Sequence, residues 1–264
     1  MRNQLFWAIA LIMVLLTSCT QETPDTKPPY LQLIKKISYQ DFSNSNFVYE
    51  INFKYNKNIL ISTTSGDPSQ GNYITKKYYY DNKRLIKTLM FEANSDEPIN
   101  GQYFAYEGKL LKTINDINGQ KIEEYEYLND VLIKKYIYIK GLSGNQTYLF
   151  EVINYETIDD NFVKESHVGV SSSQFDFNQC YKFDLSNNPF KNLDITVRKT
   201  FLIEHCSPIS QNNIIEQWSL DSNNQPSPSI VLDINYDANN FPVKIIRKFT
   251  ATQTIANETN IEYF

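Results

Sequence analysis

The amino-acid sequence predicts an all-β fold, an antiparallel meander of about 14 to 16 strands built from repeated β-hairpins. Three observations predict it: a short aromatic motif recurs along the chain, polar turn residues follow most copies, and helical periodicity is not sustained beyond the first nineteen residues. A flat sheet of this width would expose an apolar face and two unpaired edges. The meander is therefore expected to curl into a roll, a barrel-like sheet or a sandwich.

Residues 1–18 have the pattern of a secretory signal peptide. Arg2 supplies a positive charge, and an apolar run extends from Leu5 to Leu16. This run is shorter than the roughly 20 residues that a bilayer-spanning helix needs, so it reads as a cleavable segment. The segment is expected to be absent from the mature protein.

The end of this segment, Leu16-Thr17-Ser18-Cys19, resembles the lipobox of bacterial lipoproteins. The resemblance implies that Cys19 is acylated and becomes the N-terminus, which anchors the protein to a membrane through lipid. Thr20, where an Asp would favour inner-membrane retention, favours the outer membrane. Whether the protein faces the periplasm or the cell surface stays open. The alternative is an ordinary signal peptide that ends in a cysteine by chance.

The rest of the chain divides into a tether and one domain. Residues 19–29 comprise the cysteine and a polar, proline-containing stretch typical of an extended linker, and 30–264 are expected to form a single all-β repeat domain. The repeat weakens from about residue 166, so an irregular second half is an alternative. The net charge of −5, without a clustered basic face, argues against nucleic-acid binding.

The recurring motif consists of an aromatic or apolar residue, any residue, an aromatic residue, a short polar turn and an apolar pair. Its clearest copy is YYYDNKRLIK, which starts at Tyr78. The second aromatic of each copy, or of the truncated copy at the chain end, lies at Tyr55, Tyr80, Tyr106, Tyr127, Tyr155, Phe183, Tyr236 and Tyr263. A fixed arrangement that returns at similar intervals indicates a structural repeat.

Each copy is interpreted as one β-hairpin. Alternation places Tyr78 and Tyr80 on one face of a strand and Tyr79 on the other. Asp81-Asn82, like the Asn129-Asp130 pair in a later copy, tolerates the backbone conformations of tight turns. The apolar residues that follow then pair back onto the aromatic strand.

From Phe53 to Phe264 the repeat resembles the YD repeats of Rhs-type proteins, and more closely the uncharacterised YD-repeat-like lipoproteins of Gram-negative envelopes. The motif that carries the resemblance is the aromatic pair, the polar turn and the short strand after it. The resemblance implies an architecture and an envelope location, without an established activity.

Rows of tyrosine on such a sheet are candidate binding surfaces, because each ring offers a flat apolar face and a hydroxyl group. In LIKKYIYIK, for example, Leu132 and Lys134 are expected to share one face with the tyrosines that follow them. The alternative is that the rings only cover the core. The candidate binding aromatics are Tyr78, Tyr79, Tyr80, Tyr125, Tyr127, Tyr136 and Tyr138.

Two cysteines remain in the predicted domain, Cys180 and Cys206. In an oxidising compartment they are a candidate disulfide, and two buried thiols are the alternative. No catalytic residue, metal site or cofactor is expected. His205 and Cys206 are neighbours and would point to opposite faces of a strand, and no hydrolase motif surrounds His167.

Three function classes remain open. The first is a non-enzymatic lipoprotein that presents a tyrosine-rich sheet to a glycan, a protein or another envelope component. The second is a carrier that encloses a lipid or another apolar ligand. An enzyme of unrecognised type is the third.

Overall fold

A computed structural model describes residues 31–42, 47–141, 146–170, 176–201, 207–221 and 223–264. The predicted signal peptide, Cys19, the tether, His205 and Cys206 lie outside these ranges. Leu33–Phe264 form one compact unit. Within the described residues, no helix is both long and apolar enough to cross a membrane.

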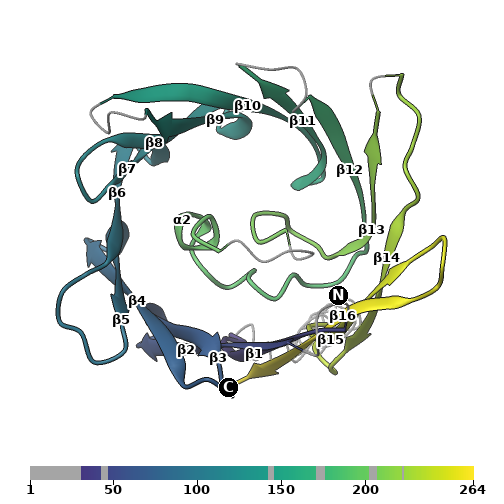
Figure 1. The fold of residues 1–264 in the computed structure, drawn as a ribbon, viewed down its shortest axis with the longest axis horizontal. Helices are drawn as coiled ribbons and strands as arrows, with labels where there is room; N and C mark the ends of the chain where they lie inside the picture. The colour runs from purple at the N-terminus through teal and green to yellow at the C-terminus, as the bar shows by residue number, and fades with distance from the viewer. Residues whose placement is uncertain (1–30, 43–46, 142–145, 171–175, 202–206, 222) are drawn as a thin grey trace, which may run out of the picture. The chain divides into compact units, whose positions relative to one another are not determined.

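The compact unit is a closed barrel of sixteen strands, each hydrogen-bonded to its neighbour in sequence (Figure 1). The predicted antiparallel meander is confirmed, and the curled sheet is a barrel. The strands are β1 (Ile34–Asp41), β2 (Phe47–Asn56), β3 (Ile59–Asp67), β4 (Asn72–Asp81), β5 (Arg84–Glu92), β6 (Asn100–Glu107), β7 (Leu110–Asp116), β8 (Lys121–Leu128), β9 (Val131–Lys140), β10 (Thr147–Ile158), β11 (Asn161–Gly169), β12 (Phe177–Phe183), β13 (Ile214–Leu220), β14 (Ile230–Tyr236), β15 (Pro242–Phe249) and β16 (Ile255–Tyr263).

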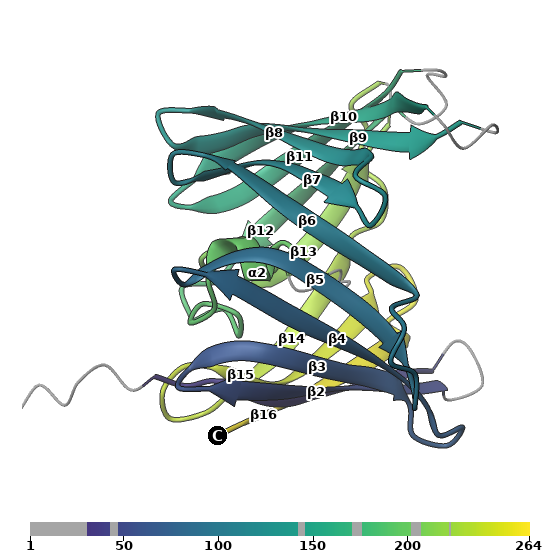
Figure 2. The same ribbon diagram turned by 90° about the vertical axis from the view of Figure 1, so that its left-hand side faces the viewer.

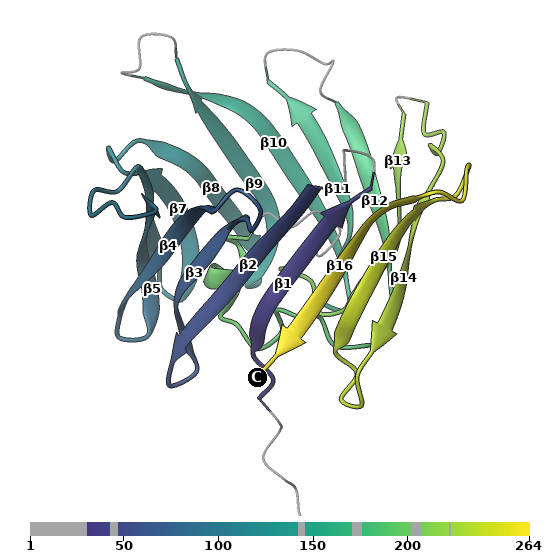
Figure 3. The same cartoon turned by 60° about the horizontal axis from the view of Figure 1, so that its bottom comes forward.

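The barrel closes where the first strand meets the last. β1 lies antiparallel to β16, with Ile37 opposite Ile261, and β1 also pairs with β2 on its other side (Figure 3). Closure leaves neither of these strands with an open edge, which is how barrels avoid edge-to-edge aggregation.

Tight turns occupy one end of the barrel, which we call the turn rim, and longer connections occupy the other end, the loop rim (Figure 2). Four of the turns have positive φ at both central residues, as two-residue hairpin turns of type I′ require. They are Lys57-Asn58, Asn82-Lys83, Asn129-Asp130 and Asp159-Asp160. The Asn and Asp residues that the sequence motif places there are the side chains that tolerate this conformation best.

The six copies of the motif that are followed directly by a hairpin turn carry a register shift at the same place, just after the turn. In the β4–β5 hairpin Tyr80 lies opposite Leu85 but Tyr79 opposite Lys87, so Ile86 is an extra residue. Such a bulge bends the strand and increases its twist. Because it recurs in successive hairpins, it supplies the curvature that closes the sheet.

The second aromatic of three copies has a specific partner in the preceding hairpin. The hydroxyl groups of Tyr80 and Tyr106 donate to the carbonyl oxygens of Leu60 and Leu85, each at 2.7 Å, and that of Tyr263 donates to Pro242 at 2.8 Å. Each acceptor lies immediately before the extra residue of its bulge. A bulge disrupts the ladder locally, so the tyrosine hydroxyl satisfies a carbonyl next to that disruption.

One hairpin differs from the others. Between β12 and β13 the tight turn is replaced by a longer segment, whose described residues 184–201 and 207–213 fold into the barrel and include the short helix α2 (Ile195–Arg198) (Figure 1). We call residues 184–201 and 207–213 the plug. Phe190 in the plug is fully buried, and Phe201 packs its ring near Phe53 and Tyr78, at centroid distances of 5.5 and 6.4 Å. The plug therefore completes the apolar core on the side of the turn rim.

Polar contacts also hold the plug to the wall. Asn161 at the start of β11 donates to the side chain of Asn212 at 3.0 Å and accepts from its backbone N–H at 2.9 Å. Lys76 of β4 donates to the carbonyl of Thr200 at 3.2 Å. The plug is thus fixed to strands on opposite sides of the barrel.

The bulges decide which side chains face inward, and one sequence expectation is wrong for this reason. Leu132 was expected to share a face with Lys134, Tyr136 and Tyr138. The extra residue Ile133 shifts the alternation, so Leu132 and Lys135 both line the interior and Lys134 lies on the outer face.

The outer face of the wall is charged. Ion pairs bridge neighbouring strands at Lys36–Glu50 (2.5 Å), Lys244–Glu258 (2.8 Å) and Lys164–Glu156 (2.9 Å). On β8 and β9, Glu124 and Glu126 accept hydrogen bonds from Tyr138 at 3.0 Å and Tyr136 at 2.5 Å. The outer face is therefore charged over β8 to β11 and over the four neighbouring strands β15, β16, β1 and β2.

Candidate functional site

A cavity of about 780 Å³ lies inside the barrel between the plug and the loop rim. The plug contributes Arg198, Lys199 and Phe201 to its lining, and β9 to β13 contribute most of the wall. Phe177, also in the lining, is 40% exposed at the loop rim. The barrel thus resembles a cup whose floor is the plug.

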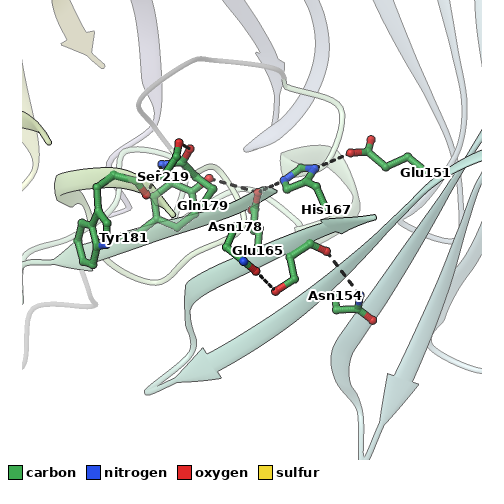
Figure 4. Close-up of polar contacts among 10 residues, drawn as sticks. Glu151, Asn154, Glu165, His167, Asn178, Gln179, Tyr181 and Ser219 are labelled. Atoms are coloured by element: carbon green, nitrogen blue, oxygen red, sulfur yellow. Dashed lines mark hydrogen bonds and ion pairs between the residues drawn. The ribbon is translucent and has the colours of Figure 1, made fainter. Parts of the chain in front are cut away.

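The most polar part of the wall is centred on His167 of β11 (Figure 4). Its Nδ1 lies 2.6 Å from a carboxylate oxygen of Glu151, and its Nε2 lies 3.4 Å from Glu165. Phe177 stacks on the imidazole at a centroid distance of 4.1 Å. Because both ring nitrogens face carboxylate acceptors, the arrangement suits the doubly protonated imidazolium.

Other polar side chains of the wall lie next to this histidine. Glu165 also accepts a hydrogen bond from the Tyr181 hydroxyl at 3.2 Å. Burial, together with this carboxylate, raises the pKa of Tyr181. Next to them, Gln179 accepts from Ser219 at 2.9 Å and donates to the carbonyl of Trp218 at 2.9 Å (Figure 4). These bonds fix the side chains in place before any ligand enters.

A second polar group lies on β8 and β9. Lys135 forms an ion pair of 3.1 Å with Glu123, and the Tyr125 hydroxyl donates to the same carboxylate. The ammonium of Lys199 lies 4.4 Å from the centre of the Tyr125 ring and donates to the Tyr127 hydroxyl at 2.8 Å. The plug is thereby tied to the aromatic pair of this motif copy.

The structure divides the seven candidate binding aromatics between the two faces of the wall. Tyr78 and Tyr125 are buried, at 5% and 2% exposure, and Tyr80 and Tyr127 pack against the same core. These four contribute to the interior, not to an exposed surface. Tyr79, Tyr136 and Tyr138 lie on the outer face, where Lys87 is 4.6 Å from the Tyr79 ring and Lys121 is 4.5 Å from the Tyr138 ring.

Cys180 is buried on β12, where it lies opposite Lys164 and Trp218. Burial raises the pKa of its thiol. Cys206 falls outside the described residues, so the disulfide between the two stays a prediction. In the described ranges, no three His, Cys, Asp or Glu residues are grouped so as to hold a metal ion.

The sequence interpretation did not identify the polar residues of the cavity. Glu151, Glu165 and His167 come from two strands, and their convergence depends on the pairing of β10 with β11. A signal was present, because Glu151 shares strand parity with Tyr155, the second aromatic of its motif copy.

We expect His167 to stabilise the fold more at acid than at alkaline pH. Burial disfavours its charged form, but hydrogen bonds to Glu165 and Glu151 outweigh burial and raise its pKa above 6.5. A raised pKa in the folded state gives a contribution that is complete below the unfolded value and is lost as pH rises through the folded value. His167→Gln should therefore destabilise the protein more at about pH 5.5 than at about pH 9.

The measurements are urea unfolding of both proteins at the two pH values and an NMR titration of the imidazole. The signal that disappears in His167→Gln identifies the residue. An equal loss of stability at both pH values, or a pKa below 6.5, would contradict the expectation.

Comparison with known proteins gives similarity at the level of solved structures. No protein-family model matches the chain, and no curated protein matches it. A porin-like protein from Bacteroides vulgatus is 10% identical, with 88% of this chain and 99% of that one covered and a TM-score of 0.48. A porin-like protein from Bacteroides uniformis is also 10% identical, with 88% and 98% covered and a TM-score of 0.37.

Part of the TcdB2-TccC3-Cdc42 structure is 14% identical to the chain, with 81% of this chain and 10% of that one covered and a TM-score of 0.33. With TM-scores below 0.5, these similarities assign neither a family nor a function.

Proposed function

We propose that this chain is a lipid-anchored, non-enzymatic binding protein of the bacterial envelope, whose barrel holds a small polar ligand inside the cup. The observation that carries the proposal is the cavity of about 780 Å³, which is lined by aromatic rings and by converging charged and amide groups. Small-molecule sites commonly have volumes of about 300–1,000 Å³ and a few fixed polar groups. This proposal places the ligand-binding surface inside the barrel and not on an exposed tyrosine-rich face.

The outer wall supports a barrel surrounded by water and attached through lipid. A lipid-facing wall presents an apolar band, and a Lys or Arg at mid-bilayer there costs about 2–4 kcal/mol. Here the outer face carries the ion pairs Lys36–Glu50 and Lys244–Glu258 on the adjacent strand pairs β1–β2 and β15–β16, and the ion pair Lys164–Glu156 on another part of the circumference, at β10–β11. In this proposal the protein is therefore attached through Cys19 and not through the wall.

The point of attachment also suits a cup that opens away from the membrane. Leu33, the first residue of the barrel unit, accepts a hydrogen bond from the backbone of Phe264 at 3.1 Å, next to the end of β16. Ile34 and Tyr263 lie opposite each other at the turn rim. The chain therefore enters the barrel at the end opposite the loop rim.

Cys19→Ala should abolish membrane attachment. Acyl chains stabilise membrane binding by about 0.8 kcal/mol per buried methylene, and the variant has no thiol to acylate. In cells labelled with a palmitate analogue, the wild type should carry label and sediment with membranes, and Cys19→Ala should do neither. Equal labelling of both proteins would refute the lipid anchor and leave the cup untouched.

Filling the cup should block ligand binding. Gln217 lines the cavity, and the adjacent Glu216 lies on the other face of β13. Saccharides, organic acids and nucleosides are screened by thermal unfolding, and compounds that stabilise the protein are measured by calorimetry. We expect at least one of them to bind the wild type and Glu216→Trp but not Gln217→Trp. A ligand that binds Gln217→Trp as well as the wild type would place the site outside the cup.

A lipid or apolar-ligand carrier remains the second candidate because of one further observation. A separate cavity of about 310 Å³ lies beside the plug, with a mostly apolar lining that includes Leu110, Val131, Phe162, Ile195 and Ile209. Co-purified lipid that disappears in Val131→Trp but persists in Gln217→Trp would favour the carrier.

A further inference from the structure

The charges that line the cup are unequal. Among the described residues of the lining, Lys135, Arg198, Lys199 and Arg247 are basic and Glu165 is acidic. Two further carboxylates contact this lining, Glu123 at Lys135 and Glu151 at His167, so the excess of positive charge is attributed to Arg198 and Lys199. The chain as a whole has a net charge of −5. The cup is thus a local concentration of positive charge in an acidic protein, which favours an anion inside it.

The two basic residues of the plug have neutral partners. Arg198 donates to the carbonyl oxygens of Pro208 and Ser210, and Lys199 donates to the Tyr127 hydroxyl. In the part of the chain that the structure describes, neither side chain forms an ion pair with a carboxylate. Their donors are satisfied, but their positive charges are not neutralised by direct contact.

This arrangement is costly for a buried cation. Burial lowers the pKa of Lys199 to about 8 and that of Arg198 to about 10. The shifts mean that the surroundings favour loss of the positive charge. An anion in the cup would offset this cost, since opposite charges attract more strongly in a site that excludes water.

The rest of the lining indicates what the anion carries with it. The rings of Tyr155, Phe177, Tyr181 and Phe201 also line the cavity. Aromatic rings offer flat apolar surfaces that stack against other planar groups.

We propose that the cup binds a small organic anion, with a carboxylate or phosphate group next to Lys199 at the floor and a planar apolar body against the aromatic wall. This inference rests on the proposed function, because it specifies the ligand of the same cavity. Carboxylates and phosphates share the negative charge that the site requires, and the experiment below separates the two.

The test compares matched probes on the full chain by calorimetry at low salt. Benzoate and phenyl phosphate are the anions, benzyl alcohol is the neutral analogue and benzylamine is the cation. At least one anion should bind at least tenfold more tightly than benzyl alcohol, and benzylamine should bind most weakly. The better of benzoate and phenyl phosphate identifies the acid group, and inorganic phosphate alone shows whether the ring is needed.

Two variants locate the charge. Lys199→Met keeps the length of the side chain and removes its charge, and should weaken anion binding at least tenfold. Lys135→Met should weaken anion binding as well. Without its 3.1 Å ion pair to Lys135, the Glu123 carboxylate keeps its negative charge and repels an anion in the cup. Lys134→Met is the matched control, since Lys134 pairs with Glu126 on the outer face, and its affinity should equal that of the wild type.

Lys135→Met keeps the test decisive if Lys199→Met disturbs the plug. Binding of benzyl alcohol as tightly as the anions would overturn the anion inference and leave the binding cup intact. Anion binding that neither variant weakens, or binding of benzylamine more tightly than the anions, would also overturn the anion inference. If no compound of this series or of the broader panel binds, both the anion site and the cup are refuted.

Discussion

Replacing Tyr78 with Ala should lower the free energy of unfolding by about 3–5 kcal/mol, the usual cost of truncating a buried aromatic residue. The Tyr78 side chain is 5% exposed and lies in the core between the barrel wall and the plug. Its ring is 6.4 Å from that of Phe201. Truncation would leave a cavity at this junction, so the variant loses wall packing and plug packing together.

The adjacent residue is the matched control. Tyr79 lies on the outer face of the same strand, with the ammonium of Lys87 4.6 Å from its ring. Tyr79→Ala should cost less than about 1 kcal/mol, the value of an exposed cation–π contact. Tyr80→Ala should follow Tyr78→Ala, because Tyr80 faces the core and donates to the Leu60 carbonyl. Urea denaturation measures all three, and equal losses for Tyr78 and Tyr79 would contradict the inward–outward alternation.

Arg198→Met should be the second most damaging substitution, with an expected loss of about 2–4 kcal/mol. Its guanidinium is buried and donates to two carbonyl oxygens of the plug, those of Pro208 and Ser210. Hydrogen bonds to a charged group contribute about 1.5–3 kcal/mol, and a buried carbonyl left without a donor costs about 1–3 kcal/mol. The methionine fills space but leaves both acceptors unpaired.

Arg84→Met provides the control for loss of an arginine. Arg84 is exposed, and its guanidinium lies 4.7 Å from the Tyr106 ring, so its replacement should cost less than about 1 kcal/mol. Arg198→Lys should recover part of the loss, because an ammonium can donate to one or both carbonyls. If Arg198→Met unfolds at the same urea concentration as Arg84→Met, the plug does not depend on this guanidinium.

The hairpin repeat was predictable because its signal is local. The alternation at Tyr78 and Tyr80, and turn residues such as Asn82, depend on backbone geometry within about ten residues. The structure confirms the meander, and its sixteen strands fall within the predicted range of about 14 to 16. The choice between roll, barrel and sandwich was open, because it depends on the pairing of β1 with β16, which are more than 200 residues apart.

The position of the plug corresponds to a gap in the repeat, which the hairpin interpretation did not explain. The second aromatics lie at Tyr155 and Phe183 and then only at Tyr236, roughly twice the usual interval. The structure places the plug in that gap. The charged lining of the cup was harder to predict, since one extra residue at each bulge changes which side chains face inward, as at Leu132 and Lys135.

The pairing of β1 with β16 has a consequence for the order of folding. Synthesis of the chain begins at its N-terminus, so β1 becomes available long before its partner, Ile255–Tyr263. Until that last strand arrives, β1 and β15 each present an open edge that can pair with another chain. Closing contacts between distant segments are also slow to form. The interval before closure is therefore when the chain is most exposed to aggregation, and loss of β16 would make that interval permanent.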